Sequence, residues 1–356
     1  MITVTKPDLP PLEEYVALLE TIWQSVHLTN HGPLVTRLER ELERFLEAKH
    51  VQYLTNGTIA LQIGLRALKV TKEVITTPFS YVATTSAILW EHCTPVFADI
   101  EPNTFCIDPA RVEAAITPRT EAILATHVYG YPCDVEALAA IASRHRLKII
   151  YDGAHAFDVR VGGRPIASFG DLTTLSFHAT KLFHTVEGGA IVADDDELMK
   201  SIWLLKSFGH IGDEHLTLGI NGKASEFHAA MGLCMLPRVR GFIARRKEIS
   251  ALYDSLLAGA PIQRPVPPPN VDYNYAYYPV LFASEAKALA VQSALAAHGI
   301  GARRYFFPSL DGLPYVTSAP CPVSNDVARR VLCLPLYNQL GDGDVARVVE
   351  IVRRVV

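Results

Sequence analysis

The stretch LSFHATKLFHTVEGGAIV (175–192) contains two apolar runs joined by a polar loop, and Lys181 lies in that loop. The apolar runs predict strands at 172–177 and 190–193, and the glycines at 188–189 allow tight backbone packing beside the lysine. A lysine held between two strands can be desolvated and lose its proton, as a nucleophile that forms a Schiff base must. The alternative is a solvated loop lysine, so the neighbouring motifs decide between the two.

On both sides of this stretch, short apolar runs alternate with segments of helical spacing. Strands are expected at 51–54, 74–77, 96–98, 122–126 and 148–151. Helices are expected at 11–28, 33–49, 58–68, 81–91 and 135–145. Strands separated by helices predict a parallel sheet covered on both faces. We therefore predict an α/β fold with a mostly parallel central sheet flanked by helices.

The C-terminal third has a different pattern. A helical tract at about 225–257 is followed by the proline-rich segment PIQRPVPPPN (261–270), which is typical of a linker. Beyond it, strands are expected at 275–282 and 302–305, and helices at 285–298 and 343–355. This pattern predicts a smaller α+β domain. We place the large domain with its N-terminal helices at 1–240 and the small domain at 241–356.

Polar residues stand where the predicted strands end, which is where open α/β sheets bind ligands. Gly57 and Thr58 open a helix after a strand, so their backbone N–H groups can bind an anion. Ser176 could donate to a phosphate. Asp152 ends an apolar strand, where its carboxylate could hold a positive charge on a ring nitrogen. The alternatives are a plain strand–turn–helix capped by Asn56, and Asp152 acting as a helix N-cap.

Aromatic and histidine side chains accompany these residues. Tyr81 follows a strand, and its ring could either stack on a planar cofactor or pack under the next helix. His155 lies three residues after Asp152 and is otherwise a packed histidine. No pair among the histidines near these motifs has HxxxH or HxH spacing, and no cysteine supports them, so we expect no metal site; they are His127, His155, His178, His184 and His210. No GxGxxG follows the first strand, which disfavours a nicotinamide-binding domain.

Composition narrows the function classes. Hydrophobic residues make up 49% of the chain, charged residues 20%, and the net charge is −4. These values are typical of a globular enzyme, and the scattered positive charges argue against nucleic acid as a partner. No secretory signal and no apolar run of about 20 residues is visible, so we expect no membrane partner. The six cysteines show no CxxC pair, which predicts reduced, buried thiols in a cytoplasmic protein.

With these motifs in place, the sequence resembles a known family over nearly its whole length. It is similar to the nucleotide-sugar aminotransferases of the DegT/StrS group, which depend on pyridoxal 5'-phosphate (PLP) and have the aspartate aminotransferase (type I) fold. The motifs that carry the resemblance include NGTIALQIGLRAL (56–68), YDGAHAF (151–157), SFGDLTTLSFHATK (168–181), VEGGAIV (186–192) and LGINGKASEFHAAMG (218–232). The resemblance implies the PLP transferase type I fold.

The resemblance also implies roles for single residues. Lys181 matches the lysine that binds PLP covalently, and Asp152 matches the partner of the ring nitrogen. Tyr81 matches the aromatic residue that stacks on the ring, and His155 stands near the ring hydroxyl. Asn221 matches an asparagine that reaches the phosphate bound to the other subunit, which implies a homodimer with shared active sites. The residues that match phosphate ligands within the chain are Gly57, Thr58 and Ser176.

The implied reaction transfers an amino group, with glutamate as the donor, to a nucleotide-linked keto sugar. The segment FHATKLFHT (177–185) is most similar to members that act on dTDP-4-keto-6-deoxyglucose, in biosynthesis of deoxyamino sugars such as those of lipopolysaccharide O-antigen. A 3-keto or GDP-linked sugar is the alternative substrate. A related dehydratase would carry histidine in place of Lys181, and a non-catalytic PLP-binding regulator is the remaining alternative.

For several residues the sequence leaves two roles open. LFHTVEGG (182–189) departs from the threonine-rich run of many members, so His184 either lines the sugar pocket or only packs. Arg303, Arg304 and Tyr305 either contact the diphosphate or base, or belong to a strand whose arginines face solvent. Two further candidates for the nucleotide are Lys206 and Lys223.

Overall fold

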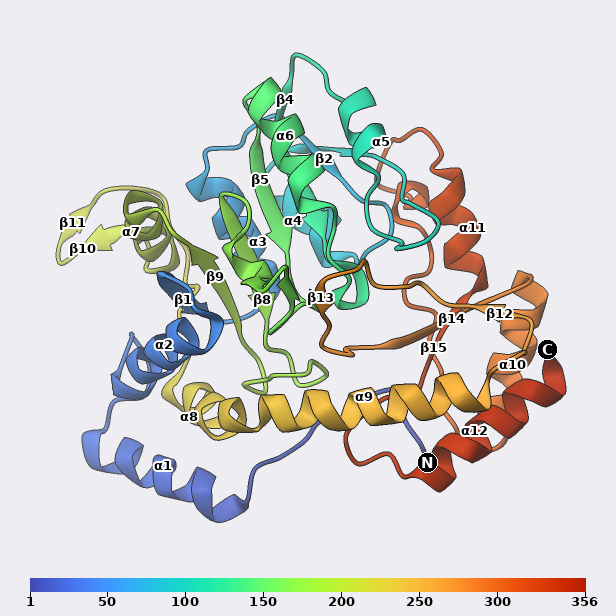
Figure 1. The fold of residues 1–356 in the computed structure, drawn as a ribbon. Coiled ribbons are helices and arrows are strands. Elements are labelled where there is room, and N and C mark those ends of the chain that lie inside the picture. The colour runs from blue at the N-terminus through green and yellow to red at the C-terminus, as the bar shows by residue number, and fades with distance from the viewer.

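The computed structural model describes the whole chain, residues 1–356 (Figure 1). The strands of its larger sheet are β1 (His50–Leu54), β2 (Glu73–Thr76), β3 (Thr94–Phe97), β4 (Thr120–Thr126), β5 (Lys148–Asp152), β8 (Leu172–Ser176) and β9 (Gly189–Ala193). They lie in the order β1-β9-β8-β5-β4-β2-β3. All neighbours from β8 to β3 are parallel, and only β9 runs antiparallel to its two neighbours. The predicted α/β fold with a mostly parallel sheet is confirmed.

Helices cover both faces of this sheet. One face carries α3 (Gly57–Ala67), α4 (Ala83–Trp90) and α7 (Asp196–Lys206). The other face carries α2 (Pro33–Leu46), α5 (Pro109–Ala114), α6 (Val135–His145) and α8 (Glu226–Met235), and α1 (Leu12–Ser25) packs on α8. In β4, Ala122 and Leu124 pack on the first side and Ile123 and Ala125 on the second. Because all four are fully buried, this strand is apolar without alternation.

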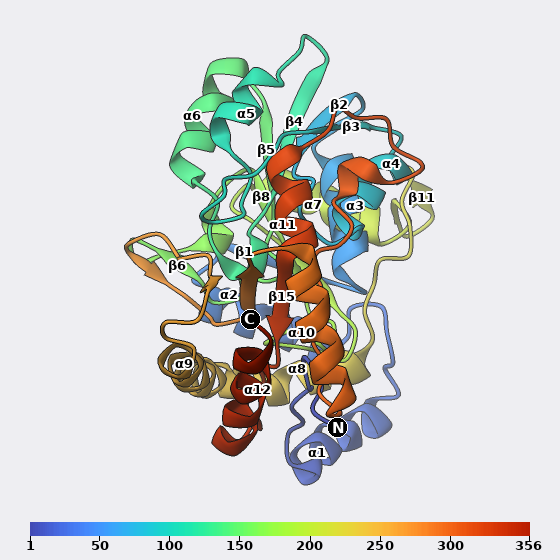
Figure 2. The ribbon, with the colours of Figure 1, turned by 90° about the vertical axis from the view of Figure 1, so that its right-hand side faces the viewer.

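A second, three-stranded antiparallel sheet lies in the C-terminal part of the chain (labelled in Figure 1; Figure 2 gives the side view). Its strands are β12 (Ile262–Gln263), β14 (Tyr278–Phe282) and β15 (Val331–Leu334). Four helices belong to this part: α9 (Val239–Leu256), α10 (Glu285–Ala297), α11 (Pro322–Arg330) and α12 (Asp342–Val355). The N-terminal Ile2 packs into the core of this sheet beside Ile300. The domain division at 240/241 stays a prediction.

Two expected elements differ from the structure. The strand expected at 302–305 is reduced to a single bridge between Arg303 and Cys333, because the chain turns directly after it. The proline-rich segment 261–270 is not a free linker, since β12 lies within it and pairs with β14. Arg264 in this segment also stacks on the Tyr278 ring at 3.7 Å. Prolines at the edge of a short strand cost no ladder hydrogen bond, so composition alone did not reveal the pairing.

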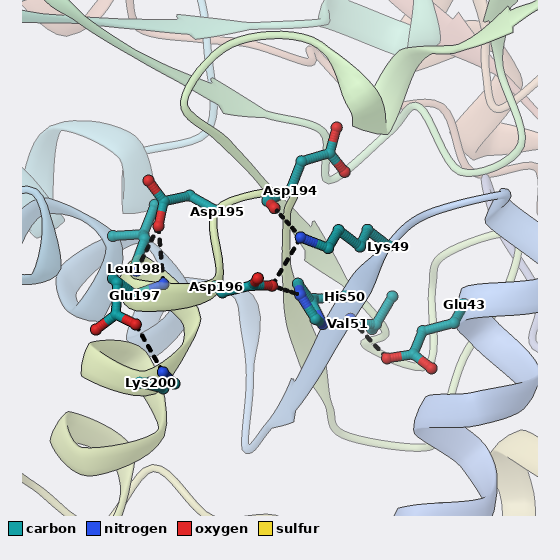
Figure 3. Close-up of polar contacts among 10 residues, drawn as sticks. All are labelled: Glu43, Lys49, His50, Val51, Asp194, Asp195, Asp196, Glu197, Leu198 and Lys200. Atoms are coloured by element: carbon teal, nitrogen blue, oxygen red, sulfur yellow. Dashed lines mark hydrogen bonds and ion pairs between the residues drawn. The ribbon is translucent and has the colours of Figure 1, made fainter.

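The outer edge of the large sheet is tied to the start of α7 (Figure 3). Lys49 Nζ lies 2.7 Å from the Asp196 carboxylate and donates to the Asp194 carbonyl at 3.1 Å. His50 Nε2 lies 2.5 Å from the same carboxylate, and Asp195 caps the helix through two backbone N–H groups. These contacts hold β1 beside β9 and thereby fix where the chain enters α3.

A short hairpin projects from the large sheet beyond α7 (Figures 1 and 2). Its strands are β10 (His210–Ile211) and β11 (Glu214–His215). We call this hairpin with its flanking residues, 208–220, the projecting arm. It exposes five apolar side chains: Phe208, Ile211, Leu216, Leu218 and Ile220. Exposed apolar residues gathered on one segment are typical of a protein–protein contact. A second hairpin is formed by β6 (Arg160–Val161) and β7 (Arg164–Pro165), with β13 (Val271–Asp272) paired to β6. No helix is both long enough and apolar enough to cross a bilayer.

Candidate active site

A cavity of about 590 Å³ opens at the carboxyl ends of the central strands. The registers of the parallel strands place Thr126, Asp152 and Thr174 side by side at this edge. Of the eight residues expected from the sequence, all except Asn221 line the cavity: Gly57, Thr58, Tyr81, Asp152, His155, Ser176 and Lys181. Residues from five separate segments therefore converge on one place.

One wall of the cavity is the first turn of α3. The Asn56 side chain accepts the N–H of Ile59 at 2.9 Å, which leaves the amides of Gly57 and Thr58 without a partner inside the helix. The Ser176 hydroxyl stands beside Gly57, where a Cβ on the glycine would lie 3.0 Å from the serine Cβ. Two free amides, a hydroxyl and the positive end of the helix dipole form a site for a phosphate-sized anion.

Gly189 allows this wall to form. A Cβ at Gly189 would lie 2.5 Å from the carbonyl carbon of Asn56 and 2.7 Å from the amide nitrogen of Gly57. Strand β9 can therefore sit against the start of α3 only with glycine at this position. The registers Leu54↔Gly189 and Ser176↔Gly189 place this residue between the two segments that form the wall. The glycine pair recognised in the sequence thus shapes the anion site.

The loop that carries Lys181 is anchored by aromatic residues on both sides. Phe177 and Phe183 are buried and meet edge-on with ring centres 4.8 Å apart, and Phe183 stacks on Phe157 at 4.7 Å. The Lys181 amide donates to the His178 carbonyl at 2.9 Å, which closes a turn. The lysine is therefore held by packing of its neighbours, and its side chain enters the cavity.

The environment of Lys181 changes the protonation of its amine. Burial lowers the pKa of Lys181 to about 8, against a smaller opposing effect of the Asp152 charge. With a pKa near 8, roughly one tenth of the side chains are neutral at pH 7, far more than for an exposed lysine. A neutral amine can attack a carbonyl carbon and can accept a proton, so Lys181 has the properties of a nucleophile and general base.

Asp152 lies at the floor of the cavity. It is 6% exposed, and burial raises the pKa of its carboxyl group. The Thr84 hydroxyl donates to Oδ2 at 2.8 Å and the Ala154 N–H donates to Oδ1 at 3.1 Å, and both bonds favour the ionised form. No cation lies within ion-pair distance of this buried carboxylate, although buried carboxylates are normally paired. The site therefore suits a ligand that brings a positive charge.

His155 and Tyr81 complete the set of expected residues. His155 is buried, its Nδ1 accepts the Tyr129 N–H at 3.3 Å, and burial holds its pKa well below the usual value, so the ring is neutral. The Nε2 of His155 therefore carries the proton and can donate to a ligand. Tyr81 is 54% exposed at the mouth of the cavity, so it is not a residue packed under α4.

Two aromatic residues of the site were not identified from the sequence. Tyr277 and Phe306 line the cavity and flank His155, with ring centres 5.0 and 5.6 Å away. They come from the C-terminal part of the chain, so only the tertiary fold brings them to the cavity. The sequence offered a signal only next to Phe306, where Arg303, Arg304 and Tyr305 were candidates for contact with the nucleotide.

The structure separates the candidate cations for the nucleotide. Arg303 lines the cavity, lies 4.5 Å over the Tyr305 ring and has no acidic partner. Arg304 points elsewhere, since it pairs with Glu285 at 2.7 Å. Lys206 is buried against Glu39 and therefore is not available to a ligand.

Three other residues lie outside the cavity. His184 is buried, with Nε2 donating to the Asp8 carbonyl at 2.7 Å and Nδ1 accepting the Val186 N–H at 3.2 Å, so it packs. Asn221 is exposed and accepts from Lys223 Nζ at 2.9 Å. The same ammonium lies 4.4 Å over the ring of Phe208 on the projecting arm.

The sequence matches the DegT/DnrJ/EryC1/StrS aminotransferase family over residues 12–353. A dTDP-4-amino-4,6-dideoxy-D-glucose transaminase of Shigella dysenteriae is 42% identical over 362 residues, covering 99% of this chain and 99% of that protein. A protein of the same name from Escherichia coli is 42% identical over 363 residues, covering 98% and 97%.

A solved structure extends the likeness to three dimensions. The crystal structure of DesI in the presence of its TDP-sugar product superposes with a TM-score of 0.94 and 36% identity, covering 99% of this chain and 92% of that one. The sequence match and the shared fold both show that the chain belongs to the DegT/DnrJ/EryC1/StrS aminotransferase family.

Proposed function

We propose that this enzyme uses PLP to transfer an amino group from glutamate to C4 of dTDP-4-keto-6-deoxyglucose. The observation that carries the proposal is the meeting of Lys181 and Asp152 in one cavity whose wall is an anion-binding helix terminus. The names of the Shigella and Escherichia relatives support the sugar and the nucleotide. A 3-keto or GDP-linked sugar is the alternative substrate.

The residues of the cavity fit PLP group by group. The amides of Gly57 and Thr58 and the Ser176 hydroxyl suit its phosphate, and the unpaired Asp152 carboxylate suits a protonated ring nitrogen. The further roles that we propose are Tyr81 stacked on the ring and His155 beside the ring hydroxyl. When bound, PLP supplies an aldehyde that takes up the amino group and a ring that withdraws electrons from the adjacent carbon.

Protons are moved by the chain itself. The amine of Lys181, which is partly neutral near pH 7, accepts the proton from the amino-bearing carbon of glutamate and returns a proton to the cofactor side. Bound PLP would carry the amino group between the two substrates. One water supplies the carbonyl oxygen of 2-oxoglutarate, and one water is released when the amino group replaces the carbonyl oxygen of the keto sugar. Arg303 supplies a positive charge to the anionic groups of the substrates.

We further propose a homodimer whose active sites are shared. The projecting arm exposes apolar side chains that a second copy would cover, and Asn221 at its base does not line the cavity of its own chain. In this arrangement Asn221 of the partner subunit completes the phosphate site. Two features support this proposal: the resemblance of Asn221 to an asparagine that reaches the phosphate of the other subunit, and the exposed arm.

Absorbance of the purified protein tests the first half of the reaction. PLP-loaded enzyme is expected to show a near-visible band that moves to the near-ultraviolet after glutamate is added. A protein without such a band after incubation with PLP would contradict the proposal. Lys181→Ala is expected to abolish turnover, and Lys200→Ala, at an exposed lysine on α7, is the matched control. A panel of dTDP-, UDP- and GDP-linked keto sugars then identifies the acceptor.

A second experiment tests whether each active site contains residues of both subunits. Lys181→Ala and Asn221→Ala chains, each nearly inactive alone, are mixed under conditions that exchange subunits. A mixed dimer contains one site with both native residues, so activity should return. If mixing restores nothing although mixed dimers form, the two residues act within one chain and the shared site is wrong.

A further inference from the structure

Three buried hydroxyls continue from Asp152 into the interior of the large sheet. Thr84 Oγ1 lies 2.8 Å from Asp152 Oδ2, Ser80 Oγ lies 2.9 Å from Thr84 Oγ1, and Thr126 Oγ1 lies 3.1 Å from Ser80 Oγ. All three residues are at most 2% exposed. They come from the start of α4, the segment before it and the end of β4. Their side chains thus form a continuous chain that ends on the carboxylate.

The direction of each hydrogen bond follows from counting protons. An ionised carboxylate only accepts, so the one hydroxyl proton of Thr84 is committed to Asp152. Thr84 must therefore accept from Ser80, and Ser80, having spent its own proton, must accept from Thr126. The three O–H dipoles all point toward the carboxylate. Bonds aligned in this way polarise one another and stabilise the negative charge at the end of the chain.

We propose that Ser80, Thr84 and Thr126 are positioning residues that keep Asp152 ionised and aimed at the ring nitrogen of the cofactor. This inference rests on the proposed PLP-dependent function, because it assigns the chain of hydroxyls to ring-nitrogen recognition. Burial alone favours the neutral carboxyl group, and a neutral Asp152 could not pair with a protonated ring. The hydroxyl chain counteracts the effect of burial on the pKa of Asp152, at the position where the site needs a negative charge.

Neighbouring threonines show that this arrangement is not the usual one for buried hydroxyls. Thr76, at the end of β2 beside β4, donates its hydroxyl proton to the Leu124 carbonyl at 2.8 Å, which is an ordinary hydrogen bond to the backbone. Thr85, adjacent to Thr84 on α4, is fully buried and its hydroxyl has no partner. Thr85 therefore offers a matched control: the same residue type, the same helix and the same burial, without the bond to Asp152.

The test replaces single hydroxyls and measures PLP rather than turnover. Thr84→Val keeps the shape and removes the bond, Thr84→Ser restores the hydroxyl, Ser80→Ala breaks the chain one step away, and Thr85→Val is the control. The first readout is the dissociation constant of PLP from the apoprotein. The second is the nitrogen-15 chemical shift of ring-labelled PLP bound to each variant, which reports whether the ring nitrogen is protonated.

Loss of one hydrogen bond to a charged group should raise the dissociation constant of Thr84→Val about 10- to 100-fold. The nitrogen shift of that variant should move toward the unprotonated value. Ser80→Ala should show the same two changes to a smaller degree, while Thr84→Ser and Thr85→Val should match the wild type. If Thr84→Val fails to fold, Ser80→Ala still decides the matter.

Two results would distinguish a failure of the proposed function from a failure of the positioning role alone. Wild-type apoprotein that does not bind PLP would remove the proposed function itself. Wild-type binding with an unchanged dissociation constant and nitrogen shift in Ser80→Ala and Thr84→Val would leave that function intact and overturn only the positioning role.

Discussion

The reactivity of Lys181 depends on two opposing effects, and one substitution separates them. Burial lowers the pKa of its ammonium group to about 8, whereas the negative charge of Asp152 raises it. In Asp152→Asn the burial remains and the charge is gone. The pKa of Lys181 should therefore fall below 8, so that at pH 7 more of the amine is neutral than in the wild type.

The structure bounds the size of this fall. The Lys181 ammonium and the Asp152 carboxylate do not form a direct ion pair, so they lie more than 4.0 Å apart. Two unit charges at 4 Å attract by about 4 kcal/mol at an effective dielectric constant of 20, which corresponds to about three pKa units. The fall must be smaller than that bound. We expect about one to two units, which places the pKa of Lys181 in Asp152→Asn between roughly 6 and 7.

The assay reads the neutral amine directly and needs no cofactor. Apoprotein is briefly reductively methylated across a series of pH values, and peptide mass spectrometry measures the fraction of Lys181 that has reacted. Because only the neutral amine reacts, the midpoint of the curve reports the pKa of Lys181. Asp171→Asn is the control, since Asp171 pairs with Lys148 at the opposite end of β5. In that variant the midpoint should stay near 8.

Two outcomes would refute this reasoning. A wild-type midpoint at the ordinary value for lysine would mean that burial does not govern the amine. A midpoint in Asp152→Asn that is unchanged or higher would mean that the two charges do not interact across the cavity. Either result would also remove the basis for treating Lys181 as partly neutral at pH 7.

Three further predictions follow from other contacts. Glu226→Ala leaves two buried amides at the start of α2 without their acceptor, and should lower the free energy of unfolding in urea by about 3 kcal/mol. Gly189→Ala should displace the start of α3 and weaken PLP binding at least tenfold, as measured by titration, whereas Gly241→Ala, in open space on α9, should bind PLP normally. Arg303→Ala should lower kcat/KM for the sugar nucleotide about 10- to 100-fold in steady-state kinetics. Arg304→Ala is the control and should leave kcat/KM nearly unchanged, because Arg304 pairs with Glu285. Equal effects of the two substitutions would contradict the different roles of the two arginines.

The sequence allowed the large sheet to be predicted because its strands are apolar on both faces and are separated by amphipathic helices. Asp152, Ser176 and Gly57 each stand at a predicted strand end, and parallel strands deliver such residues to one edge of a sheet. The meeting of seven of the eight expected residues in one cavity could therefore be predicted from local pattern. The strand at 302–305 was wrong, because apolar spacing does not show that a chain turns away after one bridge.

Other features had no local signal. Tyr277 and Phe306 reach the cavity from the C-terminal part of the chain, and Arg303 and Arg304 have the same residue type but opposite surroundings. The direction of the hydroxyl chain depends on three residues up to 46 positions apart and on a carboxylate further along.

The sequence by itself determined the fold class and the family, and it predicted most of the residues that the cavity brings together, because periodicity and motifs are set by neighbouring positions. Only the tertiary structure decided which polar groups are buried together, which arginine faces the cavity and how far burial lowers the pKa of Lys181. These properties depend on distance and desolvation, and both arise only when segments far apart in the chain are packed against each other.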